Sequence, residues 1–201
     1  MLILASRSNA RKALLLAAGL EFGTEPSQID ERAVENETAA RGADGRGIAL
    51  ALAEAKASEV AARRPADVVV AADQTLALGY ELLHKPGTLP DAARQLDHLR
   101  GRTHRLHAGV ALAVEGVLVW SAVDTAELTM REFDAAERDA VLALEGGRVL
   151  ESVGGYRLEG PSVRLFESIR GDYFTILGLP LLQLLGALRL HAPDLLATAR
   201  P

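Results

Sequence analysis

The sequence predicts an α/β protein in which helices flank a mixed, twisted β-sheet. Three observations carry this prediction. Strand and helix patterns alternate in the first half of the chain. Residues 68–72 form a continuous apolar run, which is typical of a buried strand. Two long strand patterns, 103–114 and 117–129, are separated by Glu115-Gly116, a good tight turn for an antiparallel pair. Alternation together with an antiparallel pair indicates a mixed sheet.

The length of 201 residues fits one large domain or one domain of two lobes. The 201 residues are 49% hydrophobic but only 4% aromatic, which favours an aliphatic α/β interior and argues against disorder. The chain has no cysteine, which excludes disulfides, zinc–thiolate sites and thiol catalysis. A net charge of -5 without a long basic run argues against binding to a nucleic-acid polymer.

Neither a signal peptide nor a membrane span is expected. The start, MLILASRSNARK, has no charged region ahead of an apolar segment. The longest strongly apolar stretch, 176–190, contains Gly, Pro and Gln and is too short to cross a bilayer. We therefore expect a cytoplasmic protein without a membrane partner.

Local signals place the elements of the first half. Residues 2–5 resemble a short buried strand, and the following helix has Ser8 as its N-cap and Gly19 as its stop. Residues 22–35 are predicted to be extended or irregular, and 36–46 to be a loop or the start of a helix. An Ala-rich helix is predicted over 48–64, ending before Pro65.

The second half begins with a hairpin predicted over 76–83, with Gly79 in its middle, and an amphipathic helix over 90–99. Asp134 and Glu137 resemble a capping box for a helix that continues through residue 144. A Gly-rich segment covers 146–160, and 171–178 is predicted to be a loop or a short strand. The last helix is expected to start at Pro180, and the tail from residue 193 is expected to fray.

A phosphate site is one of two interpretations of the first strand–loop–helix segment. Arg11 and Lys12 lie in the first helical turn, where cations oppose the helix dipole at a cost of about 0.3–1 kcal/mol each. A phosphate bound there would make the two cations favourable at this position and would also meet the hydroxyls of Ser6 and Ser8. The alternative is an ordinary capped helix whose cations are solvated.

Asp73 follows the apolar run directly, at the predicted carboxyl end of a strand, where ligands bind in open α/β sheets. It could be a metal ligand or a base that activates water; alternatively, it caps the next turn. Glu31, Lys56 and Lys85 form a scattered set of charged groups, each of which alone is more often a surface residue. His104 and His107 should point to opposite faces of one strand, so no histidine metal site is expected.

Together these segments resemble the Maf-like protein family. The motifs in chain order are Leu-Ile-Leu-Ala-Ser-Arg-Ser-Asn-Ala-Arg-Lys from residue 2, Ile29-Asp30-Glu31, Lys56-Ala57, Ala72-Asp73-Gln74-Thr75, Lys85-Pro86, residues 99–104, 156–160 and 171–180. Each motif is weak alone, but their order over roughly residues 2–190 is specific.

The resemblance implies a mixed α/β fold of two lobes around a deep cleft. It also implies a nucleoside triphosphate pyrophosphatase that needs Mg or Mn and hydrolyses the α–β phosphoanhydride to a nucleoside monophosphate and pyrophosphate. Homodimers, a house-cleaning role against non-standard nucleotides and a link with septum formation belong to the same expectation.

The resemblance also assigns roles to individual residues. Asp73 corresponds to the proton acceptor, and Ser6, Arg11, Glu31, Lys56 and Lys85 correspond to the other site residues. A triphosphate carries about four negative charges, so a metal and several cations are required. We accordingly expect metal binding by Glu31 and Asp73, and phosphate binding by the hydroxyls and cations Ser6, Ser8, Arg11, Lys12, Lys56 and Lys85.

The sequence departs from the family pattern where the base would be selected. The family's dTTP/UTP pattern has Arg, Thr and Gln where this chain has Ala10, Gln74 and Glu159. A family lysine is also missing from residues 151–154. A carboxylate only accepts hydrogen bonds, so Glu159 favours a base with ring N–H and amino donors, such as guanine or a modified guanine.

Two other functions fit parts of the sequence. One is a regulator of cell division that binds nucleotides with little catalysis. The other is a generic phosphate-binding α/β domain, such as a sugar-phosphate enzyme. Asp73, Glu31, Lys56 and Lys85 occurring together favour the hydrolase over the first, and the C-terminal motifs favour it over the second.

Overall fold

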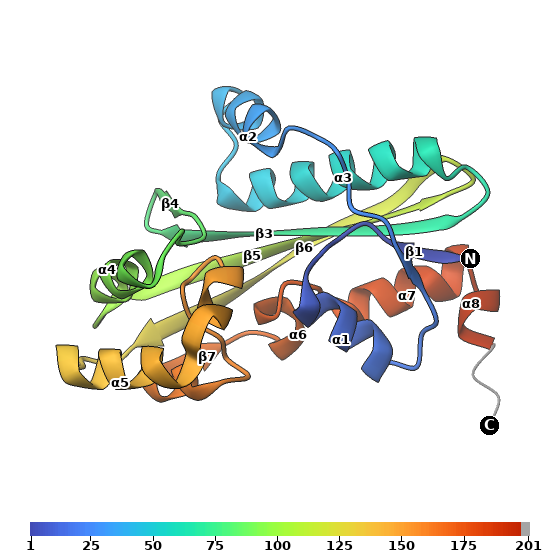
Figure 1. Ribbon diagram of the computed structural model, residues 1–201. Coiled ribbons are helices and arrows are strands. Elements are labelled where there is room, and N and C mark those ends of the chain that lie inside the picture. The colour runs from blue at the N-terminus through green and yellow to red at the C-terminus, as the bar shows by residue number, and fades with distance from the viewer. Residues whose placement is uncertain (198–201) are drawn as a thin grey trace.

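The computed structural model describes residues 1–197. Figure 1 shows a long sheet with helices on both faces. The strands are β1 (Leu2–Leu4), β2 (Gly23–Thr24), β3 (Val68–Leu78), β4 (Glu81–Leu83), β5 (Thr103–Val114), β6 (Val117–Met130) and β7 (Phe166–Arg170). The helices are α1 (Asn9–Ala17), α2 (Glu31–Ala40), α3 (Gly45–Arg63), α4 (Leu89–Leu99), α5 (Ala135–Glu145), α6 (Tyr173–Ile176), α7 (Leu181–His191) and α8 (Asp194–Ala197), with 3-10 turns η1 (Gly146–Glu151) and η2 (Pro161–Leu165).

The sheet is mixed, as the sequence predicts. Its strand order is β2-β1-β3-β5-β6-β7, and β4 pairs with the far end of β3. Strand β1 runs parallel to β2 and β3, whereas the other pairs are antiparallel. The long strands β3, β5 and β6 extend from one end of the molecule to the other, so both ends belong to one sheet.

Side chains that alternate along β3 serve two different cores. Val69 and Ala71 pack with the small residues of α3 on one face, and Val70 and Ala72 pack with α1 and α7 on the other. A third cluster, at the opposite end of the sheet, packs α4, α5 and the 3-10 turns against β5 and β6. The expected two lobes therefore sit at the two ends of one sheet (Figure 1).

Asp73 lies in the middle of β3, not at the carboxyl end of a strand as expected. The sequence placed the end at residue 72, but the strand continues to Leu78 because β5 pairs along it from Val69 to Ala77. On its other side, β3 pairs with β1 only at Val68–Val70 and with β4 only from Leu76. The strand edge beside Asp73 is thus left open between two partners.

Two segments, those of α2 and α6, are helical where irregular structure or loops were expected, and α3 begins at Gly45, within the segment predicted as a loop or the start of a helix. Helix α2 occupies residues that were predicted to be irregular up to residue 35 and to be a loop or the start of a helix from residue 36, and it has no buried residue. Asp30 caps it by accepting a hydrogen bond from the Ala33 amide, and Asp44 and Asp172 cap α3 and α6 in the same way. Cap residues, not an apolar stripe, define these helix starts, so hydrophobic periodicity does not reveal them.

Other local predictions are confirmed. Ser8 caps α1, and Asp134 caps α5. Glu115 and Gly116 join β5 to β6 with φ values of 51 and 78°, the left-handed pair that a tight hairpin turn requires. By contrast, the prediction that the tail frays from residue 193 is wrong for residues 194–197, which form α8, and 198–201 lie outside the described residues. In the described part of the chain, no helix is both long and apolar enough to cross a membrane.

We expect Gly109→Ala to destabilise the fold. Gly109 is the partner of Asp73 in the β3–β5 pairing, and α3 crosses it so closely that a Cβ atom would lie 2.3 Å from the Ala49 carbonyl oxygen. The backbone of α3 must move to make room, at a cost of about 1–3 kcal/mol or more. Urea unfolding measures the loss.

The matched control is Gly186→Ala in α7, where a Cβ atom meets nothing within 4 Å. That change should leave stability equal or higher by about 0.5–1 kcal/mol, because alanine is the better helix former. Equal stability of Gly109→Ala and the wild type would contradict the close approach of α3 to the sheet.

Candidate active site

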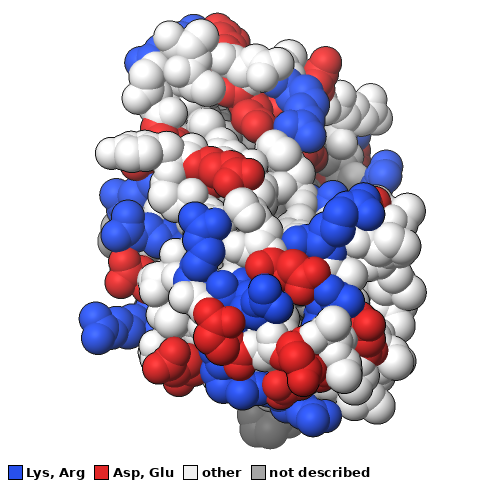
Figure 2. Space-filling view, turned by 90° about the vertical axis from the view of Figure 1, so that its left-hand side faces the viewer, with Lys and Arg blue, Asp and Glu red and all other residues white. Residues whose placement is uncertain are grey.

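A cleft of about 1180 Å³ lies between the two lobes. Its walls come from the loop before α1, from α2, from the open edge of β3, from the segment after β4, and from residues 148–159 and 173–177. Basic and acidic side chains are interspersed on the face that Figure 2 shows. With a net charge of -5, attraction of an anion has to come from individual groups in the cleft and not from the field of the whole protein.

Lys56 joins two carboxylates in the cleft. Its Nζ lies 2.5 Å from Asp73 Oδ1 and 2.8 Å from Glu31 Oε1. The Lys56 and Asp73 side chains are only 9% and 13% exposed, whereas Glu31, at the start of α2, is 58% exposed. The structure thus brings together three of the predicted site residues, and the ammonium compensates the charge of the buried Asp73.

Asp73 and Glu31, the two predicted metal ligands, are brought together by their shared contact with Lys56. Among the residues the structure describes, no group of three or more His, Asp or Glu side chains is placed to hold a metal ion. A metal at this position would therefore draw its remaining ligands from water or from a bound substrate.

Arg11 is largely occupied by the protein itself. Its Nε donates to the Gly178 carbonyl at 2.8 Å, and its Nη1 donates to the Ala72 carbonyl at 2.7 Å and to Ser6 Oγ at 3.2 Å. Burial lowers the pKa of Arg11, while the charges of Asp73 and Glu31 oppose that shift. The guanidinium therefore ties the start of α1, the strand around Asp73 and the loop before α7 together.

The remaining predicted phosphate ligands are unequally placed. Ser6 Oγ accepts from the Ser8 amide at 3.2 Å, and Ser8 Oγ accepts from the Arg11 amide at 3.4 Å, so both hydroxyls line the cleft within the turn into α1. Lys85 also lines it, and burial together with the nearby charge of Arg11 lowers its pKa. Lys12 is not among the lining residues, so the structure does not bring it to the site.

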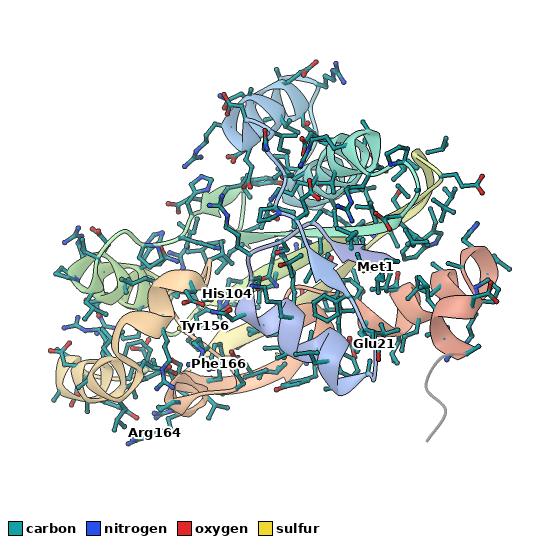
Figure 3. The ribbon with its side chains drawn as sticks, turned by 45° about the vertical axis from the view of Figure 1, so that its right-hand side comes forward. Met1, Glu21, His104, Tyr156, Arg164 and Phe166 are labelled. Atoms are coloured by element: carbon teal, nitrogen blue, oxygen red, sulfur yellow. The ribbon has the colours of Figure 1, made fainter. Side chains whose placement is uncertain are left out.

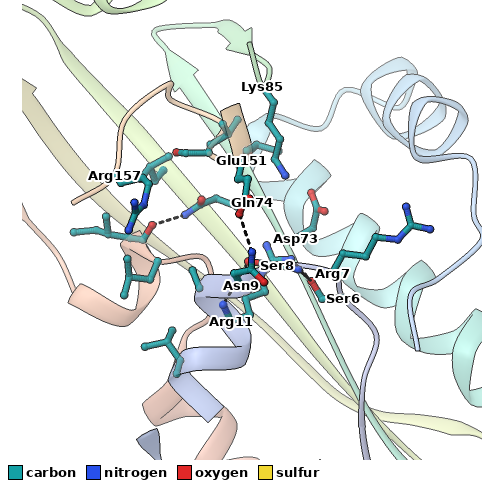
Figure 4. Close-up of a pocket in the computed structure, with 18 of the residues that line it drawn as sticks. Ser6, Arg7, Ser8, Asn9, Arg11, Asp73, Gln74, Lys85, Glu151 and Arg157 are labelled. Carbon is teal, nitrogen blue, oxygen red and sulfur yellow. Dashed lines mark hydrogen bonds between the residues drawn. The ribbon is translucent and has the colours of Figure 1, made fainter. Parts of the chain in front are cut away.

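Gln74 is held by the loop at the end of the cleft. Its Nε2 donates to the carbonyls of Thr175 and Ile176, both at 3.0 Å, which leaves Oε1 as its free polar atom (Figure 4). Thr175 is fixed in turn by donating to Asp124 at 2.7 Å. Ala10 lines the same cleft from the first turn of α1.

Glu159 is part of an ion-pair network that the sequence did not reveal. Arg157 donates from Nε to Glu159 at 3.0 Å and from Nη1 to Glu145 at 3.3 Å. The Glu145 side chain is fully buried and also accepts from the amide and hydroxyl of Ser162. Asn9 donates to Glu151 at 3.1 Å across the cleft. Arg157, Glu151 and Arg7 also line the cleft. Arg7 and Arg157 lie within segments that resemble family motifs, but no role was assigned to any of the three from the sequence.

A buried histidine–tyrosine pair supports this wall. His104 Nε2 lies 2.6 Å from the Tyr156 hydroxyl, and the Tyr156 ring meets Phe166 edge-on at 4.9 Å (Figure 3). Burial lowers the pKa of His104 to about 4 and raises the pKa of Tyr156. His107 instead contacts Thr125 at 2.8 Å, as the predicted alternation of faces requires.

Relatives align with nearly the whole chain. The family model described as Maf-like protein matches residues 1–191. A protein named 7-methyl-GTP pyrophosphatase from Brucella suis biovar 1 is 50% identical over 94% of each chain. One named nucleoside triphosphate pyrophosphatase from Rhodopseudomonas palustris is 49% identical over 94% of this chain and 92% of the relative. A solved dITP/XTP pyrophosphatase from Mycobacterium abscessus aligns over 97% of this chain and 96% of its own, at 19% identity and a TM-score of 0.43.

Proposed function

Because this chain belongs to the Maf-like protein family, we propose that it is a nucleoside triphosphate pyrophosphatase, which converts a nucleoside triphosphate to the monophosphate and pyrophosphate. The observation that carries the proposal is the Glu31–Lys56–Asp73 cluster in the cleft. Relatives that are about half identical over 94% of the chain carry the same activity in their names.

Asp73 is proposed to accept the proton of the attacking water. The water oxygen bonds to the α-phosphorus, the bond from that phosphorus to the bridging oxygen breaks, and pyrophosphate leaves with the bond's electrons. Lys56 holds the Asp73 carboxylate in place through its 2.5 Å contact. Lys85 lines the cleft and can stabilise charge that develops on the phosphate oxygens.

A divalent metal ion, Mg²⁺ or Mn²⁺, fits the donor set as a proposal. Asp73 and Glu31 lie close enough to contact the same Lys56 ammonium, each through one carboxylate oxygen, which leaves the second oxygen of each carboxylate outside that contact. Hard cations of this type bind through one or two carboxylates together with substrate phosphates. When bound, the ion would neutralise phosphate charge and polarise the phosphorus under attack.

A panel of standard and modified nucleoside triphosphates, including 7-methyl-GTP, tests the activity with Mg²⁺, with Mn²⁺ and with chelator. We expect equal amounts of pyrophosphate and monophosphate, and no turnover with chelator. Release of inorganic phosphate in place of pyrophosphate would contradict α–β cleavage. Nucleotide binding without hydrolysis of any substrate would favour a binding-only regulator of cell division.

We propose a guanine-type base, and 7-methylguanine in particular, as the preferred base. Arg157 contacts one oxygen of Glu159, which leaves the other oxygen able to accept from ring N–H and amino groups. Methylation at N7 places a positive charge on the purine, which a carboxylate attracts. Relatives named 7-methyl-GTP pyrophosphatase agree with this proposal.

Glu159→Gln is expected to weaken this preference. The variant keeps the size of the side chain but loses its charge, so the ratio of kcat/KM for 7-methyl-GTP to that for UTP should fall by about tenfold, the effect of one charged hydrogen bond. The exposed Glu167→Gln is the matched control, because Glu167 does not line the cleft. An unchanged ratio would remove Glu159 from base selection.

The localisation, the oligomeric state and the cellular role of the enzyme are likewise proposals. We propose a cytoplasmic house-cleaning enzyme that removes non-standard nucleotides and works as a homodimer, on the basis of its family. Sedimentation of the purified chain tests the dimer, and accumulation of modified nucleotides in cells that lack the protein tests the role.

A further inference from the structure

The cations that line the cleft fall into two groups. Most are already paired: Lys56 with two carboxylates, Arg11 with backbone carbonyls, Arg157 with Glu145 and Glu159, Arg32 with Glu35, and Arg148 with the carbonyls of Leu144 and Glu145. Within residues 1–197, Arg7 and Lys85 line the cleft without a hydrogen bond or an ion pair. These two positive charges are available to an anionic ligand without breaking an existing contact.

Arg7 also lies on a defined side of Asp73. It is an exposed residue of the loop between β1 and α1, directly after Ser6. In Figure 4, Gln74 and Arg157 lie on one side of Asp73, while the Arg7 side chain extends away from them on the other. The inference rests on the proposed function: with the base near Gln74 and Glu159 and the α-phosphorus near Asp73, the β- and γ-phosphates extend toward Arg7.

We propose that Arg7 binds the pyrophosphate half of the substrate and retains it as the leaving group. A guanidinium matches phosphate oxygens through two parallel hydrogen bonds, which makes arginine better suited to this position than a lysine. Because Arg7 is exposed and has no protein partner, no existing contact has to break when it binds a phosphate. Its contact distinguishes a triphosphate from a monophosphate, which has no group on that side.

The test compares Arg7→Gln, Arg7→Lys and the wild type in inhibition by the two products. Magnesium pyrophosphate and the nucleoside monophosphate are each titrated as inhibitors of nucleotide hydrolysis. We expect Arg7→Gln to raise the inhibition constant of pyrophosphate by about tenfold and to leave that of the monophosphate within about twofold. Arg7→Lys should restore part of the loss, because the charge is kept but the paired hydrogen bonds are not.

The control is Arg189→Gln, which removes the same charge from an exposed residue of α7 outside the cleft and should change neither constant. The proposal would be overturned if Arg7→Gln raised the inhibition constants of both products equally, or if it raised neither. Calorimetric binding of magnesium pyrophosphate to the wild type and to Arg7→Gln needs no turnover. A wild type that hydrolyses no nucleotide would defeat the proposed function, whereas equal binding of pyrophosphate by both proteins would defeat the role of Arg7.

Discussion

Asp73→Asn should abolish pyrophosphate release, lowering kcat by at least about 10²–10⁴, the usual contribution of a positioned general base. The amide cannot take a proton from water, although it keeps the shape of the carboxylate. Lys56 keeps Glu31 as a partner at 2.8 Å, so the cluster does not lose all of its negative charge. Pyrophosphate release under saturating nucleotide measures the effect.

Asp194→Asn supplies the matched control, because Asp194 is exposed at the start of α8 and does not line the cleft. It should retain full activity, and the thermal unfolding midpoints of both variants should stay close to that of the wild type. An Asp73→Asn protein that still turns over at a near-wild-type rate would show that Asp73 is not the proton acceptor.

Lys56→Met is expected to cost both stability and activity. Methionine is an unbranched side chain of nearly the same length, but Asp73, 13% exposed, loses its cationic partner. Removing one member of a buried ion pair costs about 3–5 kcal/mol, because the other charge stays desolvated. Since Glu31 is partly solvated, we expect a loss near the lower end, about 3 kcal/mol. Urea unfolding at neutral pH measures it.

The double variant Lys56→Met with Asp73→Asn distinguishes the contribution of the ion pair to stability from the contribution of packing. It should recover part of the lost stability, because no unpaired charge remains at the position of Asp73, while activity stays absent. If Lys56→Met is as stable as the wild type, or if the second change gives no recovery, then the 2.5 Å contact does not stabilise the fold as proposed.

Some features were determined by the sequence alone, because short segments specify them. The N-caps at Ser8 and Asp134 and the turn at Glu115-Gly116 depend on backbone groups within three or four residues. The apolar run before Asp73 predicts burial on both faces, which the cores of β3 confirm. The resemblance to a family adds the roles of site residues, but no single segment of the sequence determines the distances between those residues.

Only the tertiary structure decided how the site residues meet. Asp73 lies within a strand because β5, more than thirty residues later, pairs across it, and the open edge beside it exists because β1 ends early. Arg11 is satisfied by a carbonyl 167 residues away, and Gln74 by two carbonyls at 101 and 102 residues. Hydrogen bonds between such distant groups depend on the packed fold, whereas a propensity or a motif reflects neighbours along the chain. The sequence proposed Glu31, Lys56, Asp73 and Lys85 as site residues, and the fold determined which charged groups of the cleft are paired and which, like Arg7, remain available to a substrate.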